Sequence, residues 1–255
     1  MNIRLKPCRF CGEVTAISSK SDAHRLLIAS ALSDRPTFIR CNARSADITA
    51  TVNCLNSLGA DIKFVDGGIS VKPIKEKRKS AVLDCNESGS TIRFLLPVAA
   101  SLGTNTEFTG GGRLPERPLS PLREQMEAHG VVFTPINVFP VKINGKMMSG
   151  EFTIKGNISS QFITGLLFAL PLLNGNSIIN VIPPVESRPY IDMTLNTLKK
   201  FGITVTEKGN SFFIPGGQKY ASPGTVESEG DWSNSAFFLT AGAVSGRVTV
   251  TGLDV

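Results

Sequence analysis

The stretch SGSTIRFLLPVAASLG, from Ser88 to Gly103, decides the fold of this chain. A turn of serine and glycine is followed by one arginine and then by a run of mostly apolar residues, which predicts a buried helix with an open first turn. The same construction recurs as KSDAHRLLIASALS from Lys20 to Ser33, as SSQFITGLLFALPLLNG from Ser159 to Gly175 and as SNSAFFLTAGAVSG from Ser233 to Gly246. The chain is therefore expected to repeat one structural unit.

Two markers in the sequence give this repeat the same length. The first marker is a set of aligned positions in the apolar helices, 68, 72 and 71 residues apart: Arg25, Arg93, Gly165 and Ala236. The second is a set of glycines, 71 and 72 residues apart, that end three amphipathic helices: Gly59, Gly130 and Gly202. Because two independent markers share one period, we predict a repeat of about 70 residues.

One complete unit, from Ala81 to Ile143, reads as strand, helix, strand, helix and a final pair of strands, with its second helix expected from Pro118 to His129. Three such βαβαββ units predict an α/β (α+β) fold in which a pseudo-threefold domain covers residues 15–228. A fourth unit, in residues 229–255, stops after its second strand and cannot bury its own apolar face. We therefore expect residues 1–14 and 229–255 to be parts of a second, truncated domain.

Composition and charge limit the partners that this chain can have. It has 255 residues, of which 41% are apolar, and a formal net charge of +6 that favours anionic ligands. Its basic residues are scattered, and it has only two tyrosines and one tryptophan, so we expect small anionic substrates rather than nucleic acid. The one dense basic run, Lys72–Lys79, is interpreted as a solvated connector.

We expect a cytoplasmic protein without a membrane span. Residues 1–15 contain Arg4, Lys6 and Arg9 and no long apolar run, so no signal peptide is expected. The most apolar stretch, Phe162–Leu173, is too short to cross a bilayer.

The five cysteines agree with a reducing compartment. Cys8 and Cys11 form a lone CxxC motif without a second pair or a nearby histidine, so we expect neither a zinc site nor a redox motif there. The remaining cysteines are interpreted as ordinary buried thiols: Cys41, Cys54 and Cys85.

The helix starts carry the candidate chemistry. A helix N-terminus exposes unpaired backbone N–H groups and partial positive charge, and therefore binds anions well. Hydroxyl and cationic residues recur there at one phase of the repeat: Lys20, Ser21 and Arg25; Ser88, Gly89, Ser90 and Arg93; Ser159, Ser160 and Gln161. If the three units surround one axis, these helix starts can line a single pocket. Two ordinary alternatives stay open, because each serine can be only a helix cap and each arginine can simply pair with an acid such as Glu87.

Five segments resemble, in order, the motifs of one enzyme family. They are Lys20-Ser21-x-x-x-Arg25, Ser88-Gly89-Ser90-Thr91-Ile92-Arg93, Leu114-Pro115-Glu116-Arg117-Pro118, Ser159-Ser160-Gln161-Phe162 and Ser187-Arg188-Pro189-Tyr190-Ile191-Asp192. This series is similar to that of the 5-enolpyruvylshikimate-3-phosphate synthase family (3-phosphoshikimate 1-carboxyvinyltransferase). The resemblance implies the inside-out barrel of the enolpyruvyl transferases, with two domains of three βαβαββ units each, and neither metal nor cofactor.

The resemblance also implies a reaction and a role for the motif residues. The enolpyruvyl group would pass from phosphoenolpyruvate to the 5-hydroxyl of shikimate 3-phosphate, with release of phosphate, in the shikimate pathway of aromatic amino acid biosynthesis. The residues implied to hold shikimate 3-phosphate are Lys20, Ser21, Arg25, Ser159, Ser160, Gln161 and Ser187, with Tyr190 near its ring. Those implied to contact phosphoenolpyruvate are Lys20, Gly89, Arg117 and Gln161. Lys20 is implied to be catalytic, and the full-length protein to be a monomer.

Two departures from the family pattern bear on this expectation. Glu87 stands where many relatives have asparagine, which places a negative charge near an anionic site unless the carboxylate pairs with a base such as Arg93. The acid–base carboxylates of the family belong to the second domain and are expected beyond Val255, so this stretch alone is expected to be inactive.

Two alternative functions stay open. The UDP-N-acetylglucosamine enolpyruvyl transferase family shares the fold and the donor, but it has Lys-Asn where this chain has Lys20-Ser21. It also usually has a cysteine in the loop that here runs from Gly110 to Arg117. The alternative of another class is a non-catalytic ligand-binding domain, because half of the expected site is missing.

Overall fold

The computed structural model describes residues 4, 9–135 and 139–254. Most of them form three four-stranded sheets, each with two neighbouring parallel strands followed by an antiparallel pair. The second repeat comprises β5 (Ser80–Asp84), α3 (Gly89–Leu102), β6 (Asn105–Thr109), α4 (Leu122–Ala128), β7 (Val132–Thr134) and β8 (Val141–Asn144). The third comprises β9 (Glu151–Lys155), α5 (Ser160–Ala169), β10 (Ser177–Ile182), α6 (Arg188–Lys200), β11 (Thr206–Lys208) and β12 (Ser211–Ile214). The predicted βαβαββ order is confirmed in both.

The first repeat takes one of its strands from the far end of the domain. It contains α1 (Lys20–Ala31), β2 (Thr37–Arg40), α2 (Ala46–Ser57), β3 (Asp61–Val65) and β4 (Gly68–Lys72). The strand parallel to β2 is β13 (Thr225–Glu227), which follows the third repeat in sequence. This pairing closes the three repeats into a ring, because the last segment of the domain completes the first unit.

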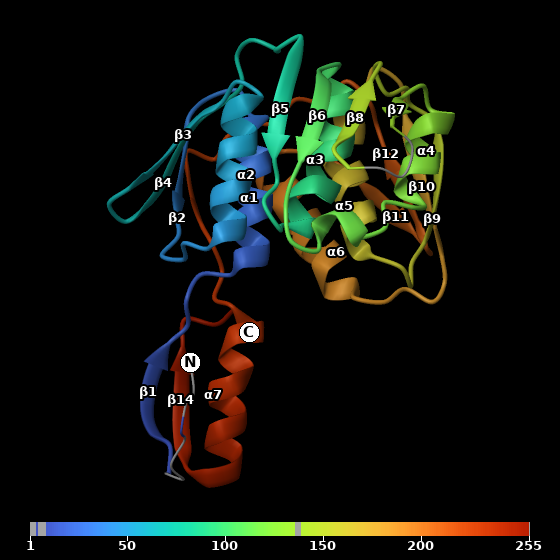
Figure 1. Ribbon diagram of the computed structural model, residues 1–255. Helices are drawn as coiled ribbons and strands as arrows, with labels where there is room; N and C mark the ends of the chain where they lie inside the picture. The colour runs from blue at the N-terminus through green and yellow to red at the C-terminus, as the bar shows by residue number, and fades with distance from the viewer. Residues whose placement is uncertain (1–3, 5–8, 136–138, 255) are drawn as a thin grey trace.

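Helices α1, α3 and α5 lie in the interior, and the sheets lie on the outside (Figure 1). Every residue of α1 from Asp22 to Ala31 is buried, and most of α3 and α5 is buried as well. Helix α3 packs along α5, while α1 packs against α2 and α6. Helices that are apolar almost all round need such a central position, which explains why the repeated apolar stretches decide the fold.

One predicted helix is shorter than expected. The helix expected from Pro118 to His129 begins only at Leu122, and residues 118–121 form an irregular segment. A helix covering that segment would place Pro121 in its interior, where proline has no N–H to donate and its ring clashes with the preceding turn. Of the basic run expected to be a solvated connector, residues 75–79 form an exposed loop before β5, whereas Lys72 ends β4 and Pro73 is buried.

The two ends of the chain pair with each other apart from the ring. Strand β1 (Cys11–Thr15) lies parallel to β14 (Arg247–Thr251), and α7 (Trp232–Ser245) packs on β14. Figure 1 shows these elements as a separate lobe, joined to the ring by two segments that run side by side. Backbone hydrogen bonds of 2.7 and 2.8 Å, from Ser19 N–H to Glu229 and from Asp231 N–H to Ile17, hold these segments together.

Large apolar side chains on this lobe are exposed, including Phe237 (78%) and Val244 (81%).

Within the described ranges, no helix has both the length and the apolar character needed to cross a membrane. Cys8 of the CxxC motif lies outside the described residues, whereas Cys11 is exposed. The remaining cysteines are free and buried, as expected: Cys41, Cys54 and Cys85.

The interior holds one completely buried histidine, His24 of α1. Burial lowers the pKa of its imidazole from 6.5 to about 3, so the ring is neutral in the folded chain. In the unfolded chain the same ring gains a proton as the pH falls below about 6.5. Protonation therefore favours the unfolded state, and the contribution of His24 to stability is lost as the pH falls from 6.5 towards 3.

We expect a His24→Asn variant to lose less stability on acidification than the unaltered chain. The difference in unfolding free energy between pH 7 and pH 4.5 should be smaller by about 2 kcal/mol in the variant. Urea titrations of both chains at the two pH values measure it. Identical losses would show that His24 does not carry this pH dependence.

Candidate functional site

Three helices of the ring open their N-termini on one hollow. Helices α1, α3 and α5 begin at Lys20, Gly89 and Ser160, and residues of all three first turns line a cavity of about 510 Å³. The lining side chains are mostly hydroxyl-bearing or charged: Lys20, Ser21, Arg25, Ser90, Arg93, Phe94, Ile158, Ser159, Ser160, Gln161, Ser187, Tyr190, Asp231 and Ser233. Converging helix N-termini with two arginines and a lysine make this hollow suitable for an anion.

The structure brings together the residues that the sequence assigned to shikimate 3-phosphate. All seven line this hollow: Lys20, Ser21, Arg25, Ser159, Ser160, Gln161 and Ser187. Of the residues assigned to phosphoenolpyruvate, Lys20 and Gln161 also lie here, while Gly89 and Arg117 lie beside each other at its edge. A Cβ atom added to Gly89 would stand 2.7 Å from Arg117 Nη1 and 3.7 Å from Arg93 Nη1.

Some of the predicted serines do act as helix caps. Ser88 Oγ accepts the backbone N–H of Thr91 at 3.2 Å, and Ser159 Oγ accepts that of Gln161 at 3.2 Å. Helix α1 is capped by Ser19 rather than by Ser21. The ordinary explanation therefore applies to Ser88 and Ser159, whereas Ser21 and Ser160 stand in first turns that are capped by another residue.

Ser187 has an unusual backbone. It precedes α6 with φ 57° and ψ 35°, in the left-handed region that non-glycine residues seldom adopt, and its side chain makes no capping bond. Strained residues of this kind concentrate at functional sites. Ser187 is exposed and lines the hollow, and its side chain does not cap the helix N-terminus, which suits a residue that binds a ligand.

Arg25 donates its hydrogen bonds to other residues of the chain. It is 2% exposed, and its guanidinium donates to Thr194 Oγ1 (2.8 Å) and Thr164 Oγ1 (3.4 Å) and to the carbonyls of Ser21 (2.6 Å) and Tyr190 (2.8 Å). Burial lowers the pKa of Arg25 to about 10. The side chain thus joins α1 to α5 and α6 and fixes the wall that carries Tyr190, with little capacity left for a ligand.

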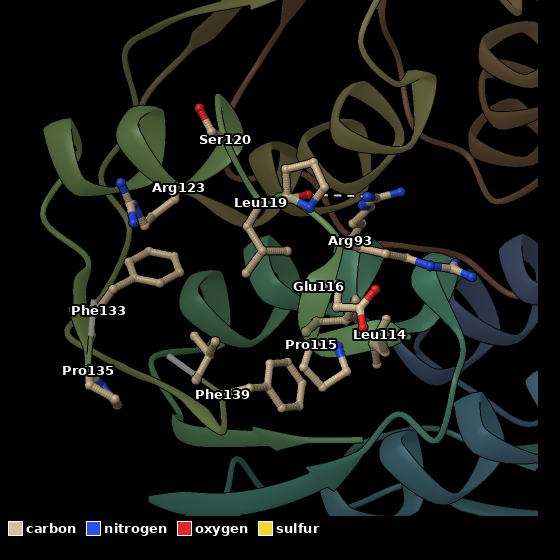
Figure 2. Close-up of a pocket in the computed structure, with 14 residues that line it drawn as sticks. Arg93, Leu114, Pro115, Glu116, Leu119, Ser120, Arg123, Phe133, Pro135 and Phe139 are labelled. Carbon is tan, nitrogen blue, oxygen red and sulfur yellow. Dashed lines mark hydrogen bonds between the residues drawn. The ribbon is translucent and has the colours of Figure 1, made fainter. Parts of the chain in front are cut away.

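Arg93 connects this hollow with a second one of about 240 Å³, which Figure 2 shows. Its guanidinium donates to Gln161 Oε1 at 2.7 Å and to the Pro118 carbonyl at 3.1 Å, and Gln161 Nε2 donates to Ser90 Oγ at 2.9 Å. Burial and the nearby Arg117 lower the pKa of Arg93. In the part of the chain that is described, neither arginine forms an ion pair with a carboxylate. Two neighbouring cations therefore remain available to an anion at this corner.

The alternative that Glu87 pairs with Arg93 is wrong. The Glu87 carboxylate lies against Gly112, where an added Cβ would stand 2.5 Å from Glu87 Oε2 and 2.6 Å from Oε1. Gly112 has φ 53°, so the glycine loop can turn closely around this carboxylate. The negative charge of Glu87 is consequently directed at the loop around Gly112 and not at Arg93.

Two polar residues that line the hollow were not identified as site residues in the sequence analysis. Asp231 and Ser233 belong to the segment that was assigned to a second domain, yet they reach the hollow from the start of α7. Asp231 Oδ1 caps that helix through the Asn234 N–H at 2.8 Å, and its Oδ2 lies 3.4 Å from the Lys20 backbone nitrogen. The acidic cap before an apolar helix was the signal that could have revealed Asp231. On the rim, Lys20 Nζ pairs with Asp47 at 2.8 Å.

Three βαβαββ repeats with a hollow suited to an anion at the starts of their inner helices define a protein of the enolpyruvyl transferase class. A solved structure of EPSP synthase from Acinetobacter baumannii superposes with a TM-score of 0.80 at 22% identity, over 96% of this chain and 56% of that chain, which supports the fold. The sequence model of EPSP synthase (3-phosphoshikimate 1-carboxyvinyltransferase) matches residues 6–255, and the chain belongs to this family.

The chain is also similar to curated relatives with that name. It is 40% identical over 257 residues to the 3-phosphoshikimate 1-carboxyvinyltransferase of Brachyspira hyodysenteriae, covering 100% of this chain and 60% of the relative. It is 38% identical over 265 residues to that of Clostridium novyi, covering 100% and 61%. The chain therefore spans about three fifths of the length of these relatives. The rival family with UDP-N-acetylglucosamine as acceptor is not favoured.

Proposed function

We propose that this chain provides the shikimate 3-phosphate side of an enolpyruvyl transferase site. In the proposed reaction the 5-hydroxyl of shikimate 3-phosphate gives its proton to a base and its oxygen bonds to C2 of phosphoenolpyruvate, while C3 gains a proton from an acid. The tetrahedral intermediate then expels phosphate and loses a C3 proton, which restores the double bond. The observation that carries the proposal is the single hollow into which all seven assigned residues converge.

The proposed roles follow from the geometry. Ser160, Ser187 and the N–H groups at the start of α5 suit the phosphate of the acceptor, because hydroxyls and helix N-termini both donate to phosphate oxygens. The corner of Arg93, Arg117 and Gly89 suits phosphoenolpyruvate, since adjacent guanidinium groups stabilise its carboxylate and the departing phosphate. Lys20, on the rim beside Asp47, is assigned to contact with both substrates in this proposal.

The domain division is part of the same proposal. Residues 15–228 would form one complete domain, and residues 1–14 and 229–255 would belong to a second domain that supplies the acid–base groups. The exposed apolar side chains of the small lobe and the greater length of the relatives support it. The free, buried cysteines support a cytoplasmic location, and sedimentation of the full-length protein would test the proposed monomer.

Calorimetric titration of the chain with shikimate 3-phosphate tests the function. We expect weak but measurable binding, because the proposed contacts to this ligand are all present in the hollow. Shikimate without the phosphate and UDP-N-acetylglucosamine should give no heat under the same conditions. Absence of heat with millimolar shikimate 3-phosphate would contradict the proposal. Phosphate release by the chain from both substrates together would exclude a non-catalytic binding domain.

A further inference from the structure

Four buried polar side chains form a continuous chain of hydrogen bonds beneath the hollow. His24 of α1 meets Thr51 of α2, with 2.7 Å between Nδ1 and Oγ1, and Thr51 Oγ1 lies 2.7 Å from Thr91 Oγ1 of α3. Thr91 Oγ1 in turn donates to Ser88 Oγ, the cap of α3, at 2.7 Å. Each of the four residues is at most 1% exposed, so no ligand reaches them directly. They connect three helices that supply the site and its rim.

The hydrogen bonds can run in only one direction. The Thr91 hydroxyl gives its single hydrogen to Ser88, so the Thr51 hydroxyl must donate to Thr91. Thr51 then has no hydrogen left for His24, and the imidazole must donate from Nδ1. In the neutral ring this leaves the hydrogen on Nδ1 and a bare lone pair on Nε2. That assignment agrees with Nε2, which has no hydrogen-bond partner among the residues that the structure describes.

The hydrogen bond between His24 and Thr51 has an equivalent in another repeat. Thr51 and Thr194 each stand eight residues before the glycine that ends their unit's second helix, at Gly59 and Gly202. His24 and Thr164 each precede the aligned position of the first helix. In the third repeat the equivalent pair, Thr164 and Thr194, is hydrogen-bonded at 2.9 Å.

The second repeat has an apolar pair instead of this hydrogen bond. Ile92 and Leu122 occupy the positions that are equivalent to His24 and Thr51, and both are buried. Ile92 lines the smaller hollow. A polar link between the first and second helices is therefore present in the two repeats that flank α3, and α3 itself is reached from the first repeat through Thr91.

The chain of hydrogen bonds lies one helical turn below the rim of the site. Lys20 and Asp47 precede His24 and Thr51 by four residues each, and their side chains form the ion pair on the rim. At its other end this row of hydrogen bonds reaches Ser88, which directly precedes Gly89 and Ser90. Helices α1 and α2 are thus connected at the surface and one turn below it, and the buried connection also reaches the first turn of α3.

We propose that His24, Thr51 and Thr91 are positioning residues, whose hydrogen bonds hold the first turn of α3 in register with Lys20 and with the corner of Arg93 and Arg117. Only the identity of the ligand held at that corner rests on the proposed function. The hydrogen bonds and their direction do not depend on it.

Nitrogen-15 NMR of the histidine side chains in the unaltered chain tests the direction. Long-range couplings should show His24 as the neutral form with the hydrogen on Nδ1, from neutral pH down to mildly acidic pH. A hydrogen on Nε2 would overturn the proposal. This measurement needs no substitution, so it stands even if a variant does not fold.

A Thr51→Val variant tests the positioning, with Thr106→Val as the matched control. Thr106 is also a buried threonine with one hydrogen bond, to the Thr104 carbonyl at 2.9 Å, but it lies in β6 outside the site. In Thr51→Val the amides of Thr91 and Ile92, which donate to Ser88, should exchange about fivefold faster, the factor that one lost hydrogen bond produces. Phosphoenolpyruvate should also bind more weakly, while shikimate 3-phosphate affinity changes little.

Equal amide exchange at these positions in the two variants would overturn the proposal. Binding that weakens equally for both ligands would also contradict it, because the chain of hydrogen bonds ends at α3 and not at α5. If the unaltered chain binds neither ligand, the proposed function fails, whereas the exchange and NMR measurements still decide the positioning role.

Discussion

A Gly165→Ala variant should unfold at a clearly lower urea concentration than the unaltered chain. Gly165 of α5 faces α3, where an added Cβ would press on the Arg93 carbonyl oxygen and stand 3.1 Å from Pro97 Cγ and 3.3 Å from Phe94 Cα. Two of these contacts are with backbone atoms of a buried helix, which cannot rotate away. We expect a loss of about 2 kcal/mol, because overpacking of this kind costs about 1–3 kcal/mol and alanine recovers up to about 1 kcal/mol of helix propensity.

Gly111→Ala is the matched control for this prediction. A Cβ at Gly111 would meet nothing within 4 Å, so the same added methyl group should leave the urea midpoint almost unchanged. The slope of the urea transition should be the same in all three chains, since the surface area that is exposed on unfolding does not change. If Gly165→Ala were as stable as Gly111→Ala, the close contact of α3 with α5 would not be a requirement of this fold.

An Arg117→Ala variant should lose phosphoenolpyruvate affinity while it keeps its affinity for shikimate 3-phosphate. Arg117 lies beside Gly89 and Arg93 at the edge of the hollow, outside the set of residues assigned to shikimate 3-phosphate. Loss of a charge-assisted hydrogen bond of about 1.5–3 kcal/mol predicts roughly a tenfold or greater rise in the dissociation constant. Titration of phosphoenolpyruvate in the presence of shikimate 3-phosphate measures it.

Arg113→Ala is the control within the same loop. The Arg113 side chain is 86% exposed and pairs at the surface with Glu116, so its removal should change neither affinity. Gly89→Ala should reproduce the effect of Arg117→Ala, because its Cβ would displace the Arg117 guanidinium without disturbing α3. Equal weakening of both ligands in Arg117→Ala would refute the assignment of this corner to phosphoenolpyruvate.

Several features of the fold could be predicted because they depend on neighbours in sequence. The apolar run from Ser88 to Gly103 is a helix from Gly89 to Leu102, capped by Ser88 and ended by Gly103 with φ 74°. Caps, stopping glycines and apolar periodicity act within one or two helical turns, so they can be recognised without knowledge of the tertiary structure. Residues 118–121 were the exception, since two prolines interrupted an otherwise helical pattern.

The positions of charged groups could not be predicted in the same way. Glu87 was weighed as a partner for Arg93 because the two residues are close in sequence, yet its carboxylate turns towards Gly112. Arg25 lines the hollow, yet most of its hydrogen bonds go to α5 and α6, which follow it by more than a hundred residues. Long side chains reach partners from other repeats, and the repeat pattern does not specify which ones.

The sequence by itself determined the repeat, the inner helices and the polar residues at their starts, because each of these is set by short-range backbone preferences and by the burial of apolar faces. Only the tertiary structure decided that β13 closes the ring, that Asp231 reaches the hollow and that a buried chain of hydroxyls joins His24 to Ser88. These arrangements join segments far apart in sequence. Such contacts form only when the three repeats pack around one axis.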